Sequence, residues 1–231
     1  MFDNFGKQLY DNFILNGRYM SYVNGLGKTL YITLGALLLG IILGSLVAIV
    51  KVYSRDYPVL KPFNVICDVY ITIIRGTPMT VQLLIIYYVV FASAKITMGP
   101  YIAMFAFGLN SGAYVAEIVR GGIQSVDIGQ TEAGRSLGMT ANQTMAQIVL
   151  PQAIKTILPA LGNEMIVLFK ETAIVGYIAI EDLTKAADNI RLRTFSTAPL
   201  LIAAVMYLIV VMLMTWGLKS FERRLAKSDR R

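Results

Sequence analysis

The sequence contains no histidine and only one cysteine, Cys67, among its 231 residues. Histidine is the side chain that most often serves as a general base and as a metal ligand near neutral pH. A single cysteine excludes an intrachain disulfide and a metal cluster built on several cysteines. These absences argue against an enzyme, and we expect neither catalytic nor metal-ligating residues in this chain.

Charged residues are also scarce: they make up 15% of the chain, whereas roughly a quarter is usual in soluble domains. They leave four long uncharged gaps, from Lys28 to Lys51, Arg75 to Lys95, Lys95 to Glu117 and Arg193 to Lys219. A helix needs about 20 apolar residues to cross the hydrocarbon core of a bilayer, and lipid-exposed backbone must satisfy its own hydrogen bonds. We therefore predict an all-α polytopic membrane protein.

We expect one transmembrane domain over residues 1–231, in which residues 1–28 lie along the membrane surface and 181–193 form a polar outside loop. Gly40 and Gly44 have the spacing that lets a second helix approach closely, but ordinary glycine usage in membrane helices explains them equally well. Pro78 either starts the second span or kinks a helix that begins earlier. The five predicted spans cover about residues 29–50, 78–93, 96–116, 157–180 and 197–218.

The net charge of +7 does not indicate nucleic-acid binding, because of where the basic residues lie. They are concentrated in the tail 219–231, directly after an apolar run, where the cytoplasmic flank of a membrane helix is expected. The segments 51–62, 117–155 and 219–231 together contain more Lys and Arg than the segments on the other side. We predict a multi-pass protein with its N-terminus outside and its C-terminus in the cytoplasm.

The polar segment 127–155 carries signals for two short helices. Asp127 with Gln130, and Thr140 with Gln143, have the spacing of N-terminal capping boxes. Gly138 suits a left-handed turn after the first helix, and Pro151 is expected to stop the second. The pattern predicts helices over 129–137 and 141–150. An amphipathic hairpin on the membrane surface is the alternative, although few basic residues are present to attract anionic lipid.

Within this segment the residues read Glu132-Ala133-Gly134, then Gly138, then Ile148 and Leu150-Pro151. This order resembles the cytoplasmic signature of permease subunits of bacterial binding-protein-dependent ABC importers, with glycine at position 134 where alanine is usual. In that family the signature binds a groove on the ATPase subunit and transmits nucleotide-driven closure to the membrane helices. The resemblance implies contact with two copies of an ATP-binding subunit, which would bind the ATP and magnesium. The residues it assigns to ATPase coupling are Glu132, Ala133, Gly134, Gly138, Ile148, Leu150 and Pro151.

The resemblance covers most of the chain. Five further segments are similar to the polar amino acid branch of this family, also called the histidine/glutamine/arginine permeases. The resemblance implies a second permease copy or paralogue, an extracytoplasmic solute-binding protein and a location in the bacterial inner membrane among lipids. The chain has no phosphate-binding Gly-x-x-x-x-Gly-Lys-Ser/Thr loop, so we expect no cofactor of its own. The segments that carry this resemblance are 75–78, 81–83, 109–126, 158–163 and 169–172.

Polar side chains inside the spans indicate where a solute crosses, because such groups are costly in lipid and usually line a cavity or pair with each other. A carboxylate such as Glu164 favours an ammonium group, so a basic amino acid is the first substrate expected, with glutamine next. Glu117 and Arg120 can instead pair at the membrane edge, and Lys170 and Glu171 can pair across a dimer. The expected substrate-binding residues are Asn110, Tyr114, Asn163 and Glu164.

We therefore expect the transmembrane subunit of an ATP-driven importer for a polar, possibly basic, amino acid. An ion-coupled secondary transporter is one alternative, but five spans without a repeated half argue against it. A membrane scaffold without its own solute path is another, and it would not need the polar groups along the fourth span. The sequence does not indicate which amino acid is carried or whether the permease pairs with a copy or a paralogue.

Overall fold

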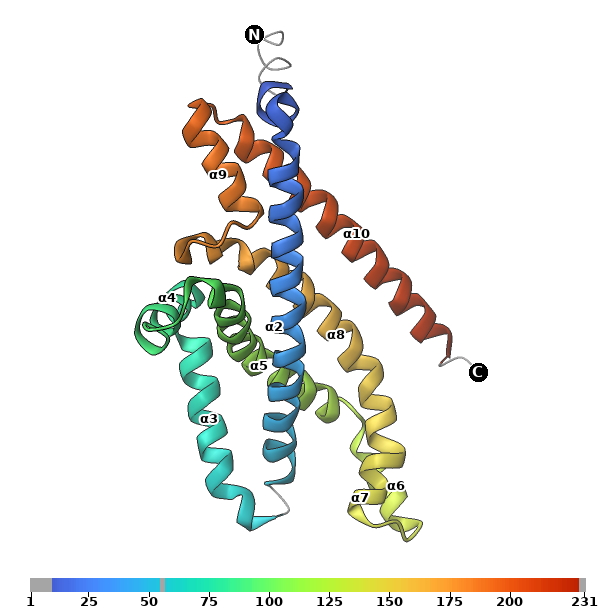
Figure 1. Cartoon of the computed structure of the whole chain (residues 1–231). Helices are drawn as coiled ribbons and strands as arrows, with labels where there is room; N and C mark the ends of the chain where they lie inside the picture. The colour runs from blue at the N-terminus through green and yellow to red at the C-terminus, as the bar shows by residue number, and fades with distance from the viewer. Residues whose placement is uncertain (1–9, 55–56, 229–231) are drawn as a thin grey trace. The chain divides into compact units, whose positions relative to one another are not determined.

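The computed structural model describes residues 10–54 and 57–228, and every regular element in that part of the chain is helical. Figure 1 traces the helices in chain order. Short 3₁₀ turns cover Leu15–Gly17, Pro58–Leu60 and Ile96–Met98. The α-helices are α2 (Tyr19–Tyr53), α3 (Lys61–Gly76), α4 (Met79–Ile85), α5 (Gly99–Gln124), α6 (Ile128–Ser136), α7 (Ala141–Thr144), α8 (Leu150–Glu171), α9 (Leu183–Thr194) and α10 (Ala198–Ser228).

The all-α polytopic class is confirmed by helices long and apolar enough to cross a membrane. Among the described residues α2, α5 and α10 meet this condition, and the broken pair 58–76 and 79–90 adds a fourth span if it is counted as one. α8 is not among them, because polar residues such as Asn163 and Glu164 interrupt its apolar sequence. The five-span arrangement therefore stays a prediction.

α2 begins at Tyr19, about ten residues before the predicted span, so residues 19–28 do not form a separate surface segment as expected. The reason is packing at Gly25. A Cβ atom there would lie 2.7 Å from the carbonyl oxygen of Asp182, so only glycine allows this close approach. Tertiary contact outweighs the low helix propensity of glycine. Residues 1–9 lie outside the described part of the chain.

The predicted break at Pro78 is confirmed. α3 ends at Gly76, Thr77 and Pro78 are extended, and α4 starts at Met79 before widening into the π-helical turn Ile86–Val90. Proline has no amide hydrogen and restricts the residue before it to extended backbone. α4 therefore begins where the second predicted span begins, and α3 is a separate helix before it.

The fourth predicted span, 157–180, is not one continuous helix. α8 ends at Glu171 and a 3₁₀ helix follows over Thr172–Ile178. The buried Thr172 hydroxyl donates to the carbonyl of Phe169 at 2.9 Å, within the turn where the helix type changes. Ala179 then ends the element with a φ of 59°, in the left-handed region.

The segment 181–193, predicted to be a loop, is instead mostly helical, because α9 occupies most of it. Asp182 caps this helix by accepting hydrogen bonds from the amides of Thr184 at 3.2 Å and Lys185 at 2.9 Å. Burial raises the pKa of Asp182, and these amide bonds act in the opposite direction. The buried side chains recur at helical spacing, at Leu183, Ala186, Ala187 and Ile190.

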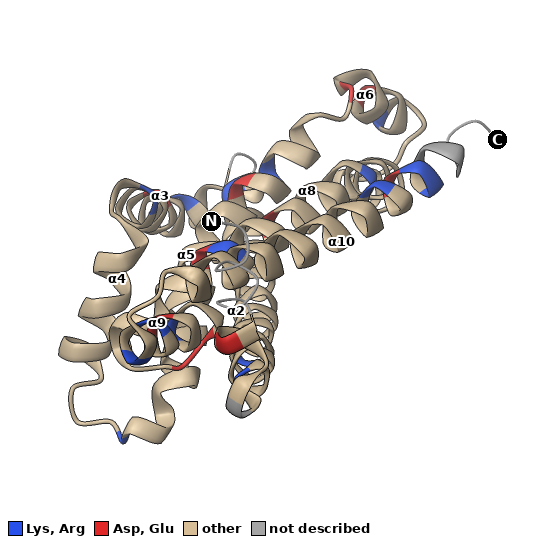
Figure 2. Cartoon of the chain, turned by 90° about the horizontal axis from the view of Figure 1, so that it is seen from above, with Lys and Arg blue, Asp and Glu red and all other residues tan. Residues whose placement is uncertain are grey.

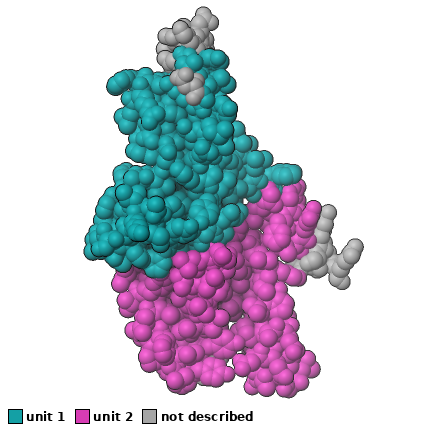
Figure 3. All heavy atoms as spheres, in the orientation of Figure 1, with its two compact units in different colours: residues 1–37, 78–108, 165–216 teal, residues 38–77, 109–164, 217–231 magenta. Residues whose placement is uncertain are grey.

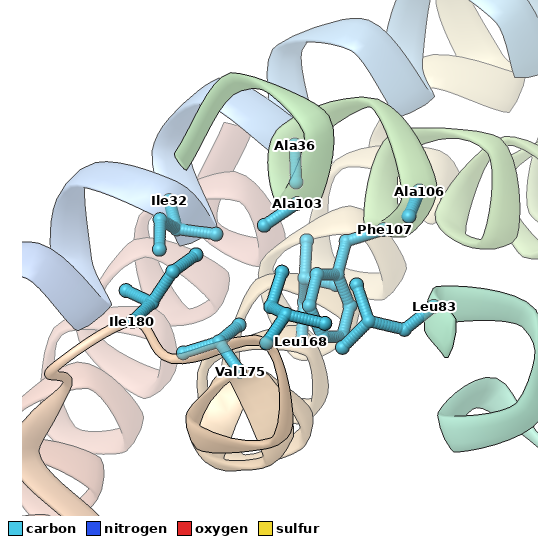
Figure 4. Packing of buried hydrophobic residues seen from close by; sticks show 10 residues of the cluster. Ile32, Ala36, Leu83, Ala103, Ala106, Phe107, Leu168, Val175 and Ile180 are labelled. Atoms are coloured by element: carbon cyan, nitrogen blue, oxygen red, sulfur yellow. The ribbon is translucent and has the colours of Figure 1, made fainter. Parts of the chain in front are cut away.

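The chain forms two compact units, and each is assembled from three separate segments (Figure 3). Unit 1 contains residues 1–37, 78–108 and 165–216, and unit 2 contains 38–77, 109–164 and 217–231. The core of unit 1 gathers apolar side chains from distant parts of the sequence (Figure 4). Its fully buried members include Ile32, Leu83, Phe107 and Val175. Burying such side chains is the main stabilising contribution to a core in water, whereas close packing is more important in lipid.

In unit 2 the two spaced glycines of α2 face α5. A Cβ atom at Gly40 would lie 2.9 Å from the Cβ of Ser111, and one at Gly44 would lie 2.6 Å from the Cβ of Val115. These distances are too short for any other residue unless neighbouring atoms shift. The close-approach interpretation of the glycine pair is therefore confirmed.

Candidate functional site: the coupling segment and a buried carboxylate

The first half of the segment 127–155, which we call the coupling segment, is α6 and its two caps. Asp127 accepts a hydrogen bond from the Gly129 amide at 2.7 Å at the start of the helix. At its end Gly138 has a φ of 84°. The Met139 amide donates to the Gly134 carbonyl at 3.1 Å, and the Gly138 amide to the Arg135 carbonyl at 3.0 Å. This is a Schellman motif, so the predicted left-handed turn is confirmed.

The second half starts with a complete capping box. The Gln143 amide donates to the Thr140 hydroxyl at 3.3 Å, and the Thr140 amide donates to the Gln143 side chain at 2.8 Å. The box predicted for Asp127 does not include Gln130. The side-chain oxygen of Gln130 instead accepts a hydrogen bond from Gln152 at 3.3 Å, and this bond connects α6 to the start of α8.

Pro151 does not stop the second helix, contrary to the prediction. α7, the π-helical turn Met145–Val149 and α8 follow one another without a break from Ala141 to Glu171. A proline inside an α-helix removes an amide hydrogen and clashes with the preceding turn. The wider π turn lies directly before Pro151, and this local adjustment of the helix accommodates the ring.

Gly134 lies where α6 packs on the second helix of the coupling segment. It is buried, and a Cβ atom there would be 2.9 Å from both the Ile148 Cδ1 and the Thr144 Cγ2. Ile148 is half-buried against it. The two members of the predicted coupling set that face inward, Gly134 and Ile148, therefore hold the two short helices together.

The other members of the predicted coupling set are exposed. The outward-facing residues of the set are Glu132, Ala133, Gly138, Leu150 and Pro151. Two further apolar side chains, Ile128 and Leu137, are 72% and 82% exposed at the two ends of α6. Exposed apolar side chains on this otherwise polar segment make it a candidate contact surface for another protein. Leu137 does not belong to the predicted coupling set.

A buried carboxylate lies further along the same continuous helix. Glu164 of α8 is 8% exposed, and its Oε1 accepts a hydrogen bond from the Ser111 hydroxyl of α5 at 2.8 Å. Both residues belong to unit 2. Asn110, next to Ser111, is also buried. Ser111 was not among the expected substrate-binding residues, and nothing in its spacing identified it as the partner of Glu164.

The other two expected substrate-binding residues lie on exposed surfaces. Asn163 is exposed although its neighbour Glu164 is buried, because consecutive residues point about 100° apart around a helix. Tyr114 is 37% exposed, and its ring centroid lies 5.3 Å from the guanidinium carbon of Arg75. That distance is typical of a cation–π contact. The four expected residues are thus divided between a buried pair and two exposed positions.

Charged residues of unit 2 form a separate cluster near the C-terminal ends of α2 and α5 and in the middle of α3. The Arg120 Nε donates to Glu117 Oε1 at 3.1 Å, which confirms the expected pairing of these two residues. Lys51 of α2 contacts Asp68 of α3 and lies 4.0 Å from Glu117 Oε1. In Figure 2 the ribbon of α4 carries no charged residue, and the charges of α10 lie toward its C-terminal end. In α10 the charged residues are thus confined to the C-terminal end.

Residues 36–227 match the family described as the inner membrane component of binding-protein-dependent transport systems. The chain is 37% identical over 209 residues to the arginine transport system permease protein ArtQ of Bacillus subtilis (strain 168), covering 90% of this chain and 93% of that protein. It is 40% identical over 205 residues to the putative glutamine transport system permease protein GlnP of Rickettsia typhi (strain ATCC VR-144 / Wilmington), covering 88% and 92%.

Solved structures resemble the chain as well. One of an amino acid ABC transporter with histidines has 42% sequence identity and a TM-score of 0.82, covering 89% of this chain and 94% of that one. A chain of the MetNI methionine ABC transporter has 19% identity and a TM-score of 0.78, covering 92% and 99%. At that identity the second likeness concerns the fold alone.

Proposed function

Because this chain belongs to the inner membrane components of binding-protein-dependent transport systems, we propose that its helices form the path by which a polar amino acid crosses the membrane. Relatives named for arginine and glutamine transport support this substrate class. The buried Glu164 supports a preference for cationic amino acids. A carboxylate in a low-dielectric site attracts an ammonium or guanidinium group far more strongly than one in water.

The proposal assigns the outer side chains of the coupling segment to contact with an ATP-binding subunit. The observation that carries this assignment is the exposed surface around Glu132 and Leu137, whose underside is packed through Gly134. The helix from Ala141 to Glu171 then leads from this surface to Glu164 without interruption. A displacement of the coupling segment would therefore be transmitted along one helix to the buried carboxylate.

The complete importer, in this proposal, contains two permease chains, two ATP-binding subunits and an extracytoplasmic solute-binding protein. The second permease is a copy of this chain or a paralogue. ATP and magnesium are bound by the partner subunits, which is consistent with the lack of a phosphate-binding loop in this sequence. The protein itself acts as a transport subunit and not as an enzyme.

The proposed orientation has the N-terminus outside and the coupling segment and C-terminus in the cytoplasm, as the distribution of basic residues indicates. Single cysteines at Ser21 and Ser228, introduced with Cys67→Ser, distinguish the two orientations. An impermeant thiol reagent added to intact cells is expected to label the first and not the second. Labelling of only the second would reverse the orientation.

The direct test of the solute path compares wild type with Glu164→Gln in vesicles that contain the whole importer. Uptake of one cationic and one neutral amino acid is measured together with ATP hydrolysis. We expect a selective loss for the cationic solute with protein abundance and hydrolysis retained. Unchanged uptake of both solutes would remove Glu164 from the path, and an equal loss of both would assign it to the common α-ammonium group or to assembly.

A further inference from the structure

Ser111 lies at a crowded point of unit 2, between Gly40 of α2 and Glu164 of α8. Its side chain is fully buried, and its hydroxyl donates to Glu164 Oε1 at 2.8 Å. A hydrogen bond to an ionised carboxylate is roughly twice as strong as one between neutral groups. The hydroxyl therefore favours one orientation of the Glu164 carboxylate over the others.

Gly40 limits where the Ser111 hydroxyl can go. A Cβ atom at Gly40 would lie 2.9 Å from both the Cβ and the Oγ of Ser111, and 3.3 Å from the Gly112 amide nitrogen. The backbone of α2 thus packs directly on the serine. Closely packed side chains have few alternative rotamers, so the position of Ser111 is determined by the contact between α2 and α5.

We propose that Ser111 is a positioning residue for substrate specificity: it orients the Glu164 carboxylate toward cationic amino acids, and Gly40 holds Ser111 in place. This inference rests on the proposed function, in which Glu164 contacts the amino acid. Ser111 acts through Glu164 and does not itself contact the solute. A site that relies on a charged group needs that group held in one geometry by neighbouring hydrogen bonds.

The test measures equilibrium binding of labelled arginine and labelled glutamine to the purified permease–ATPase complex without a solute-binding protein, which would impose its own selectivity. Four forms are compared: wild type, Ser111→Ala, Glu164→Gln and the double variant. Glu164→Gln is expected to remove most of the preference for arginine. Ser111→Ala is expected to lower the arginine-to-glutamine affinity ratio by about tenfold, the size of a lost hydrogen bond to a charged group.

The double variant separates positioning from direct contact. If Ser111 acts only through Glu164, adding Ser111→Ala to Glu164→Gln changes the ratio no further. An additional decrease in the double variant would overturn the positioning role. If Glu164→Gln shifts the ratio and Ser111→Ala does not, this inference fails while the proposed function stands. If Glu164→Gln itself has no effect, the role that the proposed function gives to Glu164 fails, and this inference fails with it.

Two glycines, one helical turn apart, supply a matched control for packing. Gly40→Ala forces a methyl group against Ser111 and is expected to lower the affinity ratio as Ser111→Ala does. In Gly44→Ala the three atoms nearest to the new methyl group, at 2.6 to 2.7 Å, belong to Val115 and to the Gly112 carbonyl, and none belongs to Ser111. Gly44→Ala is expected to reduce the amount of folded protein. The arginine-to-glutamine affinity ratio of the protein that does fold is expected to stay unchanged. Equal arginine-to-glutamine affinity ratios for Gly40→Ala and Gly44→Ala would contradict the role given to Gly40.

Discussion

The coupling segment and the Ser111–Glu164 pair are stabilised in opposite ways. The coupling segment is shaped by residues close together in sequence: an N-cap, a Schellman turn and a capping box within residues 127–143. The buried pair joins residues 53 positions apart on two different helices. Local backbone rules determine the first region, and the packing of whole helices determines the second.

This difference indicates how changes in each region should behave. A substitution on the exposed side of the coupling segment removes nothing that holds the fold, so its effect should appear in contact with a partner. A substitution at the turns acts on local conformation. A substitution near the buried pair alters both packing and the orientation of a charge, so the two consequences must be measured separately.

The largest effect is expected for Leu137→Asp, which places a charge on a side chain that is 82% exposed. We expect normal abundance in the membrane but loss of the co-purifying ATP-binding subunit. The free energy of binding between the two subunits should weaken by about 2 kcal/mol or more, the cost of losing an apolar anchor of the contact. Val59→Asp is the control, since Val59 is 73% exposed in unit 2 outside the coupling segment. Equal retention of the subunit by both variants would contradict the assigned surface.

A smaller effect is expected at the turn. Gly138→Ala puts a Cβ atom on a residue with a φ of 84°, which costs about 1 kcal/mol. Gly121→Ala is the opposite case, since Gly121 is helical and a Cβ there meets nothing within 4 Å, so it should stabilise by about 0.5 kcal/mol. The unfolding temperature in detergent should therefore decrease for Gly138→Ala and increase for Gly121→Ala. Shifts in the same direction would show that the turn is not maintained.

The smallest effect is expected for Gly134→Ala, which introduces the residue usual in the resembling family. Alanine gains about 1 kcal/mol of helix propensity over glycine. The new methyl group would approach Ile148 Cδ1 and Thr144 Cγ2 at 2.9 Å, and the end of the isoleucine can move away. The two contributions oppose each other, so we expect unfolding temperature and transport to change little. A loss of transport like that of Leu137→Asp would show that α6 cannot adjust.

Sequence patterns predicted the parts of the structure that depend on neighbouring residues. The apolar runs indicated the long helices, and Gly138 and Thr140 indicated the turn and cap of the coupling segment. Asp182 with Leu183, Ala186 and Ile190 carried the same kind of signal for α9, and that signal was missed. The predicted stop at Pro151 was wrong because a π turn accommodates the ring.

Contacts between distant residues were not predictable from one sequence. The spacing of Asn163 and Glu164 identified a polar patch, but only the packing of α8 determines that Glu164 is buried and Asn163 exposed. Ser111 is the partner of Glu164 because α5 and α8 approach each other at these two residues, 53 positions apart in the sequence. Neither glycine spacing nor polarity alone distinguishes such a contact from ordinary helix packing.

The most direct test of the central claim is crosslinking of Leu137→Cys, in a Cys67→Ser background, to the ATP-binding subunit of the assembled importer. The assignment of the coupling segment predicts a crosslinked product that contains both subunits. Val59→Cys, of similar exposure in the same unit, should give little or none. A product from Val59→Cys alone, with none from Leu137→Cys in a complex that still hydrolyses ATP, would contradict the account.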